Sequence, residues 1–184
     1  NPNERDTKKV IEFVKKFGYE GRVVLVHAIS ISAQPKEYRE KIYKELGDLG
    51  IAVVVCPSAA LSMRQLNELS SGVHNSIANI PEMLEVGITV GMGVDNICDY
   101  YQPFVDGDMW VEIRMLMEAN RFYDFDALVH IATTNGKKIF DITSYFKSLS
   151  VKIVVSTLIV LGIFSRPYRS LSSVKSPSTL TASA

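Results

Sequence analysis

The sequence predicts an α/β fold whose strands run parallel. Three short apolar runs are typical of buried strands, at residues 23–26, 51–55 and 88–94. Amphipathic helical patterns lie between these runs, and no hairpin turn signal joins one run to the next. Strand–helix–strand units of this kind form right-handed crossovers in a parallel sheet.

Each helix is predicted from apolar residues that recur every three or four positions. In the first helix, Val10, Val14 and Phe17 share one face while lysines occupy the other. Gly18 follows its last residue, where glycine commonly ends a helix. The helices are expected at residues 4–17, 32–49, 81–86, 108–119 and 125–133, and a long loop at 59–79. A loop of that length is usually functional or poorly ordered.

The helix at 108–119 is expected to bury the large apolar side chains of Trp110, Ile113, Leu116 and Met117. The helix at 125–133 is expected to end at Asn135-Gly136. Residues 151–164 are mostly apolar but too few to span a membrane, which takes about 20 residues. A buried strand pair or an interfacial segment is expected there, and disorder from Ser165 onward.

Composition limits the functional classes that fit this chain. Its 184 residues suit one domain, and 20 basic residues balance 20 acidic ones. The balance predicts neither a nucleic-acid partner nor an anionic membrane partner. Cys56 and Cys98 form no CxxC motif or disulfide framework, which indicates a reducing, cytoplasmic location. The polar start lacks Met and a signal peptide, so we expect the chain to begin partway through a protein.

Three groups with useful chemistry follow the three predicted strands. His27 ends the first strand, Cys56-Pro57-Ser58 follows the second, and Asp95 follows the third. Because carboxyl ends of parallel strands share one rim, these groups should converge. A histidine and an aspartate there suit metal ligation and proton transfer. The alternatives are a core position for His27 and a helix- or turn-capping role for Asp95.

Other motifs carry weaker signals. His74 lies in the long loop, where an exposed histidine without a function is common. His130 lies inside a predicted amphipathic helix and is expected to be structural. The Gly91-x-Gly93 pair lacks the third glycine and the following helix of a dinucleotide-binding motif. No nucleophile elbow and no HxH or HExxH spacing is present.

Three segments in this order carry a family resemblance. They are residues 21–28 (GRVVLVHA), 50–57 (GIAVVVCP) and 80–96 (IPEMLEVGITVGMGVDN). Residues 108–117 and 132–140 continue the pattern, which covers residues 5–142. As an ordered set, these segments resemble the amidohydrolase superfamily, and within it the cytosine deaminase-like branch.

The resemblance implies part of a metal-dependent (β/α)₈ TIM barrel. Residues 1–142 would supply about strands six to eight with their helices, and residues 143–184 a divergent tail. Asp95 would match the family's metal-binding aspartate, which also transfers a proton, and His27 the histidine that polarises the reacting centre. Ser58 and His74 would face a small nitrogenous substrate, and the metal would be zinc or iron.

The resemblance also implies that ligands are missing. The family's paired histidines of strand one and the histidine of strand five have no counterpart here, because the chain begins after them. We therefore expect the parent activity to be C–N hydrolysis of the deaminase type, with this chain alone inactive. With these ligands missing, the resemblance does not decide whether the chain alone binds a metal. The missing strands would come from a homo-oligomer or a complementing N-terminal half.

Two further interpretations stay open. The chain could be a non-catalytic α/β binding or assembly module that keeps the fold without the metal. It could also be a complete small doubly wound domain with a ligand in the crevice at the strand ends.

Overall fold

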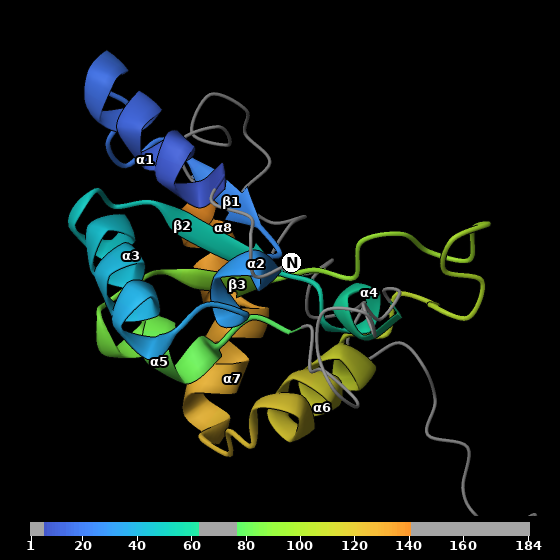
Figure 1. Cartoon of the computed structure of the whole chain (residues 1–184). Coiled ribbons are helices and arrows are strands. Elements are labelled where there is room, and N and C mark those ends of the chain that lie inside the picture. The colour runs from blue at the N-terminus through green and yellow to red at the C-terminus, as the bar shows by residue number, and fades with distance from the viewer. Residues whose placement is uncertain (1–5, 63–76, 141–184) are drawn as a thin grey trace, which may run out of the picture. The chain divides into compact units, whose positions relative to one another are not determined.

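The computed structural model describes residues 6–62 and 77–140 of the chain. Eleven helices and strands lie within these two ranges (Figure 1). In order they are α1 Asp6–Phe17, β1 Val24–Val26, α2 Ile29–Ser32, α3 Lys36–Asp48, β2 Ala52–Val55, α4 Pro57–Ser62, α5 Ile80–Glu85, β3 Val90–Met92, α6 Met109–Asn120, α7 Phe125–Ala132 and α8 Thr134–Ile139.

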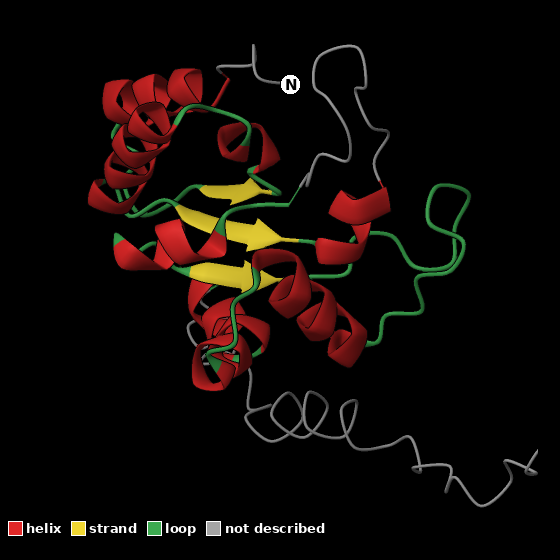
Figure 2. Ribbon diagram, turned by 60° about the horizontal axis from the view of Figure 1, so that its bottom comes forward, coloured by secondary structure: helices red, strands yellow, loops and turns green. Residues whose placement is uncertain are grey.

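The three strands form one parallel sheet in the order β1-β2-β3, which confirms the predicted fold class. Val24 pairs with Ala52 in the register of β1 and β2, and Val53 pairs with Val90 in that of β2 and β3. The three arrows point the same way and helices surround them, with α4 beyond their carboxyl ends (Figure 2). Each crossover therefore returns the chain to the same end of the sheet, as βαβ units require.

The core joins the middle of the sheet to the helices around it. Val53, Val55 and Val90 are fully buried in the strands. Their partners come from several helices: Ile11, Val14, Ile42, Leu46, Met83, Leu116, Leu128 and Ile131. Burying each such side chain contributes about 1.5–3 kcal/mol, so this shared core is the main reason the elements hold together.

Gly91 allows α8 to approach the sheet closely. A Cβ atom at this position would lie 2.8 Å from Cδ1 of Ile139, so the end of the Ile139 side chain would have to move away. The side chain of Asn135 also donates a hydrogen bond of 2.8 Å to the backbone oxygen of Val90. Gly91 therefore leaves room for α8 against β3, whereas a Cβ atom at Gly93 would make only ordinary contacts, at 3.8 Å from Sγ of Cys56 and Cγ1 of Val54.

The predicted helix at 32–49 is two helices in the structure, so that prediction was wrong in part. α2 ends at Ser32, and α3 begins at Lys36 with Pro35 as its N-cap. Proline has no N–H and disfavours helical geometry in the residue before it, so a helix through Gln34-Pro35 would be broken.

Two further boundaries differ from the prediction. The expected loop at 59–79 begins as α4, because Pro57 suits the first position of a helix. The expected stop at Asn135-Gly136 lies inside α8 instead. Thr133, at φ −133° and ψ −83°, separates α7 from α8, and the contact of Asn135 with β3 outweighs the turn tendency of Asn-Gly.

Two burial expectations were also wrong. Val26, the last residue of β1, is 56% exposed, so β1 is not buried on both faces, and among the described residues it pairs only with β2. Trp110 is 54% exposed, although Leu116 is buried as predicted. The buried face of α6 holds Glu112 and Leu116, and Trp110 lies two residues before Glu112, about 200° around the helix axis.

Among the residues that the structure describes, no helix is long and apolar enough to cross a membrane. The predicted boundary at 142/143, the apolar run at 151–164 and the segment after Ser165 lie outside the described residues.

Candidate metal and catalytic site

The candidate site lies where the three strands end. His27 directly follows β1, Cys56 directly follows β2, and Asp95 lies three residues after Met92, the last residue of β3. Backbone hydrogen bonds extend the sheet to this rim: His27 N–H donates to Val54 at 2.8 Å, and Gly93 N–H donates to Val55 at 2.9 Å. The regular sheet therefore fixes the spacing of the three residues.

Two of the three residues have an unusual backbone conformation. His27 has φ 67° and Asp95 has φ 64°, in the left-handed region that favours glycine. Each conformation turns the chain sharply at the strand end. Non-glycine residues held this way cost about 1–3 kcal/mol each and concentrate at functional sites.

The side chains of His27 and Asp95 meet at this rim. Nε2 of His27 lies 3.4 Å from Oδ2 of Asp95, and each side chain is about one third exposed. Nδ1 of His27 is buried without a hydrogen-bond partner among the described residues. Helix capping by Asp95 is not observed, because Asp108 caps α6, the next helix along the chain. The predicted convergence of His27 and Asp95 is present.

Cys56 completes a cluster with these two residues. One ligand atom from each of His27, Cys56 and Asp95 lies within 4.8 Å of the others. Burial, together with the carboxylates of Asp95 and Glu112, raises the pKa of the Cys56 thiol to about 11. The thiol is therefore protonated at neutral pH unless a cation replaces its proton.

The three donors fit a zinc-like cation. Two ligands bound at about 2.0–2.3 Å in tetrahedral geometry lie about 3.3–3.8 Å apart. The His27–Asp95 separation already has this value. Imidazole, thiolate and carboxylate are also the donor types that zinc accepts in proteins.

Ser58 is buried, and its hydrogen bonds go to another element. Its backbone N–H donates to Oε2 of Glu112 at 3.0 Å, and its hydroxyl donates to Oε1 of the same carboxylate. Glu112 is 1% exposed and lies in the first turn of α6. The pair thus joins the turn after β2 to the helix after β3.

The other predicted site residues have different outcomes. His74 lies outside the described residues, so its role stays a prediction. His130 is exposed, with Nδ1 2.8 Å from the hydroxyl of Thr134. Sequence reasoning missed Glu112, because nothing in the helical pattern of α6 predicts a buried acid. It placed Cys56 on the rim without giving it a role, although its position after a strand was the available signal.

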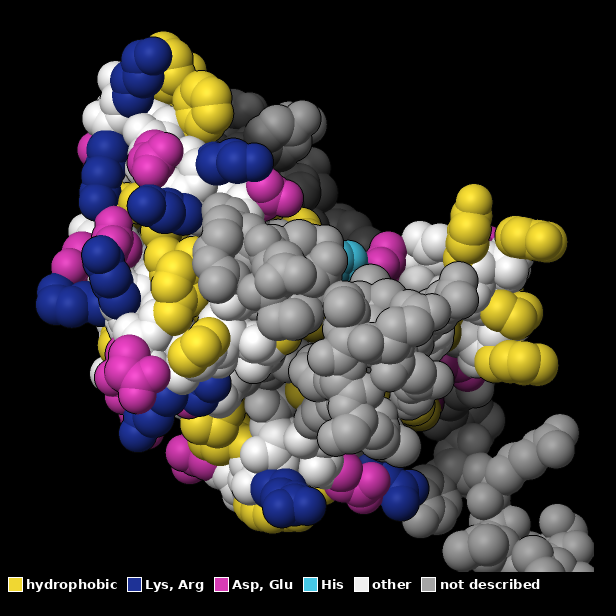
Figure 3. Space-filling model, viewed as in Figure 1, with side chains coloured by type: hydrophobic (Ala, Val, Ile, Leu, Met, Phe, Trp, Pro, Cys, Tyr) yellow, Lys and Arg dark blue, Asp and Glu magenta, His cyan; other side chains and the backbone are white. Residues whose placement is uncertain are grey.

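The loop between β3 and α6 begins at the site. Asp99 shapes its first turn by accepting from the backbone N–H groups of Tyr101 and Gln102 at 2.9 and 2.7 Å. Tyr100 and Phe104 are 93% and 95% exposed, and apolar side chains gather on this projecting loop (Figure 3). The polar contacts therefore order a loop whose aromatic side chains face solvent.

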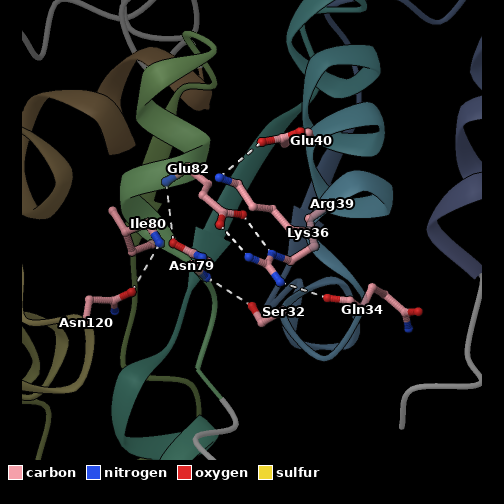
Figure 4. A network of polar contacts seen from close by, with 9 residues as sticks. All are labelled: Ser32, Gln34, Lys36, Arg39, Glu40, Asn79, Ile80, Glu82 and Asn120. Atoms are coloured by element: carbon pink, nitrogen blue, oxygen red, sulfur yellow. Dashed lines mark hydrogen bonds and ion pairs between the residues drawn. The ribbon is translucent and has the colours of Figure 1, made fainter.

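A polar network supports the segments on either side of the rim (Figure 4). Arg39 of α3 binds Glu82 of α5 through two contacts, Nε–Oε2 at 2.8 Å and Nη2–Oε1 at 2.6 Å. Ser32, at the end of α2, accepts from the backbone N–H of Asn79 at 3.0 Å. Asn120 accepts from that of Ile80 at 3.2 Å. These contacts connect the segment after His27 to the helix that leads into β3.

Comparisons with known proteins give relatives for this site and fold. No family model matches the chain. The 5-methylthioadenosine/S-adenosylhomocysteine deaminase 2 of Archaeoglobus fulgidus is 36% identical over 93 residues, which are 50% of this chain and 18% of that protein. The N-isopropylammelide isopropyl amidohydrolase of Pseudomonas sp. (strain ADP) is 28% identical over 130 residues, 68% of this chain and 28% of that protein.

A solved structure shares the fold. The 5-methylcytosine deaminase of Klebsiella pneumoniae, liganded with 5-fluorocytosine, superposes with a TM-score of 0.70 at 19% identity. The superposition covers 77% of this chain and 35% of that one. The chain thus spans less than a third of these two curated relatives and about a third of the solved structure. The chain is thus similar, over part of its length, to deaminases and hydrolases of the amidohydrolase family, and it shares the fold of a cytosine deaminase-like enzyme.

Proposed function

We propose that His27 and Asp95 act in a metal-dependent hydrolase that cleaves C–N bonds, with deamination of a cytosine-like ring as the parent reaction. The observation that supports this most directly is their contact at 3.4 Å where β1 and β3 end, in a chain that is similar to amidohydrolases. We also propose that β1, β2 and β3 correspond to strands six to eight of the barrel.

The two side chains have complementary roles in this proposal. A bound divalent metal, zinc or iron, lowers the pKa of the attacking water when it is present. Asp95 would hold the metal, and its carboxylate would accept the proton of the attacking water and pass it to the leaving amine. His27 hydrogen-bonds to the oxygen of the developing tetrahedral centre. The exposed third of each side chain gives a small nitrogenous substrate access to both groups.

We propose that the chain alone is inactive. It contains three histidines, at positions 27, 74 and 130, and none has the HxH spacing of the family's paired metal ligands. A complementing N-terminal half or a second copy of the chain would supply the missing strands. The outer edge of β1 suits their addition, because β1 pairs only with β2 in the described part of the chain.

The experiment compares the chain alone with a complemented chain. Ammonia release from cytosine and 5-methylcytosine is measured with excess zinc or ferrous ion. The chain is assayed alone and after co-expression with the N-terminal barrel half of the Pseudomonas amidohydrolase. We expect no release from the chain alone and measurable release from the pair. Asp95→Asn should lower the activity of the pair by about 100- to 1,000-fold or more, the scale on which removal of one key catalytic group acts.

A matched control separates catalysis from folding. Asp126→Asn changes an exposed carboxylate on α7 and should leave the activity of the pair unchanged. Release that persists in Asp95→Asn would contradict the proposal. If the pair forms by gel filtration but releases no ammonia, a binding or assembly module becomes the better interpretation.

A further inference from the structure

We propose that His27, Cys56 and Asp95 form a three-ligand site for a thiophilic divalent cation of the zinc class. Cys56 takes a role here that the family resemblance does not give it. The site also needs no ligand from outside this chain. The proposal rests on the proposed function only in placing Asp95 at a metal. It concerns the cation bound by the chain alone; in the complemented enzyme the added histidines would hold the metal, and His27 would be free to contact the substrate. The two are measured separately.

The strongest argument is convergence across the sheet. Neighbouring strands lie about 4.8 Å apart, so β1 and β3 are separated by about twice that distance. Nevertheless, Nε2 of His27 and Oδ2 of Asp95 approach to 3.4 Å. They do so beside the end of β2, and Cys56 is the residue that follows β2. One ligand atom from each of the three residues therefore lies within 4.8 Å of the other two, so a small shift of the side chains would bring them to the spacing of zinc ligands.

The backbone is held in the conformation that permits this convergence. Positive φ angles at His27 and Asp95 turn both strand ends, and regular sheet hydrogen bonds precede each turn. The preceding hydrogen bonds leave little freedom for the two turns to move apart. A preorganised set of donors binds a cation more tightly than one that must be assembled.

The chemistry of the donors selects the kind of cation. Thiolate and imidazole favour zinc and other late transition metals, whereas magnesium and calcium prefer sites made only of oxygen. Three protein ligands leave the fourth tetrahedral position open, as in catalytic zinc sites. The proposed site therefore holds a cation and still admits a further ligand.

The local charge also favours a cation. Asp95 and the buried carboxylate of Glu112 both act electrostatically on Cys56. In the described part of the chain, no lysine or arginine forms an ion pair with either carboxylate. A cation among the three donors would supply that missing positive charge.

Cobalt binding tests the site directly. The metal-free full chain is titrated with Co²⁺, and the near-ultraviolet thiolate-to-cobalt charge-transfer band and the visible d–d bands are recorded. We expect both bands to saturate at one Co²⁺ per chain and to disappear when Zn²⁺ is added. A large excess of Mg²⁺ should leave them unchanged.

The two cysteines of the chain provide a matched pair of variants. Cys56→Ser should lose the charge-transfer band, whereas Cys98→Ser should keep it, because Cys98 is exposed and outside the cluster. Asp95→Asn and His27→Asn should each weaken Co²⁺ binding at least tenfold. His130→Asn is the control for histidine and should bind as the unmodified chain does.

A measurement without variants keeps the test decisive if Cys56→Ser fails to fold. X-ray absorption of the unmodified chain with one equivalent of Zn²⁺ should show one sulfur ligand. No sulfur ligand, no charge-transfer band, or a band that survives in folded Cys56→Ser would overturn the site. A cobalt band without hydrolysis by the complemented pair would reject only the proposed function. Hydrolysis without the band would reject only the cysteine site.

Discussion

At the scale of single residues, unusual backbone angles mark the candidate site. His27, Ala28 and Asp95 have positive φ at the rim, and Cys98 has one in the loop that follows. Such angles are not sufficient evidence by themselves, since Arg121 has φ 51° merely as the C-cap of α6. What distinguishes His27 and Asp95 is that their side chains also meet. Strain and convergence together point to a function.

The residue-scale prediction concerns Glu112. Glu112→Ala removes the acceptor of both the Ser58 backbone N–H and its hydroxyl, and each is buried. A buried donor left unpaired costs about 1–3 kcal/mol, so we expect a loss of roughly 2–5 kcal/mol in the free energy of unfolding. Urea denaturation followed by circular dichroism measures this loss.

Two further variants make the cause of that loss clear. Glu112→Gln keeps one carbonyl acceptor and should lose less than half as much stability as Glu112→Ala. Glu118→Ala changes an exposed glutamate on the same helix and should change the free energy of unfolding by less than about 0.5 kcal/mol. Equal losses in Glu112→Ala and Glu118→Ala would show that the Ser58 contact contributes nothing.

Residue positions at the site were only partly predictable. The order of strands and the position of His27 and Asp95 at their ends were enough to predict that the two would converge. The buried contact between Ser58 and Glu112 could not be predicted, because it joins residues 54 positions apart and depends on how α6 packs. Periodicity assigns a face to each side chain but does not identify its partner across the fold.

At the scale of elements, α3 and α5 are joined by a charged contact. Arg39 holds Glu82 through two hydrogen bonds, with side chains 19% and 22% exposed, and also donates to the backbone oxygen of Gln34 at 2.8 Å. Hydrogen bonding to Arg39 is the main reason that the pKa of Glu82 lies below its usual 4.5. The contact therefore favours the ionised form of Glu82 in the folded state.

The element-scale prediction is a dependence on pH. A lowered pKa in the folded state means that the stabilisation is complete above the unfolded pKa, near 4.5. It is lost as pH falls below that value, through the folded pKa. Glu82→Gln should therefore lower the free energy of unfolding by about 1–2 kcal/mol at pH 7, and this difference should shrink steadily below pH 4.5. Urea denaturation at each pH measures the difference.

Glu85 provides the control on the same helix. Its side chain is exposed, and Glu85→Gln should have little effect at any pH. A difference between Glu82→Gln and the unmodified chain that stays constant from pH 7 to pH 3 would contradict the ionic origin of the contact.

Element boundaries were harder to predict than element types. Each of the three strands and the helices α1, α6 and α7 lie where the periodicity indicated. The break before Lys36 could have been predicted from Pro35, whose effect on a helix is local. Helix α8 could not have been predicted from the sequence, because Asn-Gly favours a turn. The contact of Asn135 with Val90, which depends on the folded structure, accounts for a helix there.

At the scale of the whole molecule, the two edges of the sheet differ. α7 and α8 contact β3, and Ile139 lies against Gly91. In the described ranges, no strand pairs with the outer edge of β1, where Val26 is 56% exposed. The sequence predicted a parallel sheet but not which edge is open, because strand order depends on packing and not on local pattern. An open, apolar edge is a site for pairing with another chain.

The last prediction follows from this open edge. We expect the full chain to self-associate in a concentration-dependent way, measured by sedimentation velocity. Val26→Lys places a charge on the edge, which is a known means of preventing strand pairing. Burying a valine contributes about 1.5–3 kcal/mol, so the dissociation constant should rise roughly tenfold or more. Val129→Lys adds the same charge at a valine of α7 that is 45% exposed, and should leave association unchanged. A chain that stays monomeric at every concentration, or equal effects of the two substitutions, would show that association does not use the edge of β1.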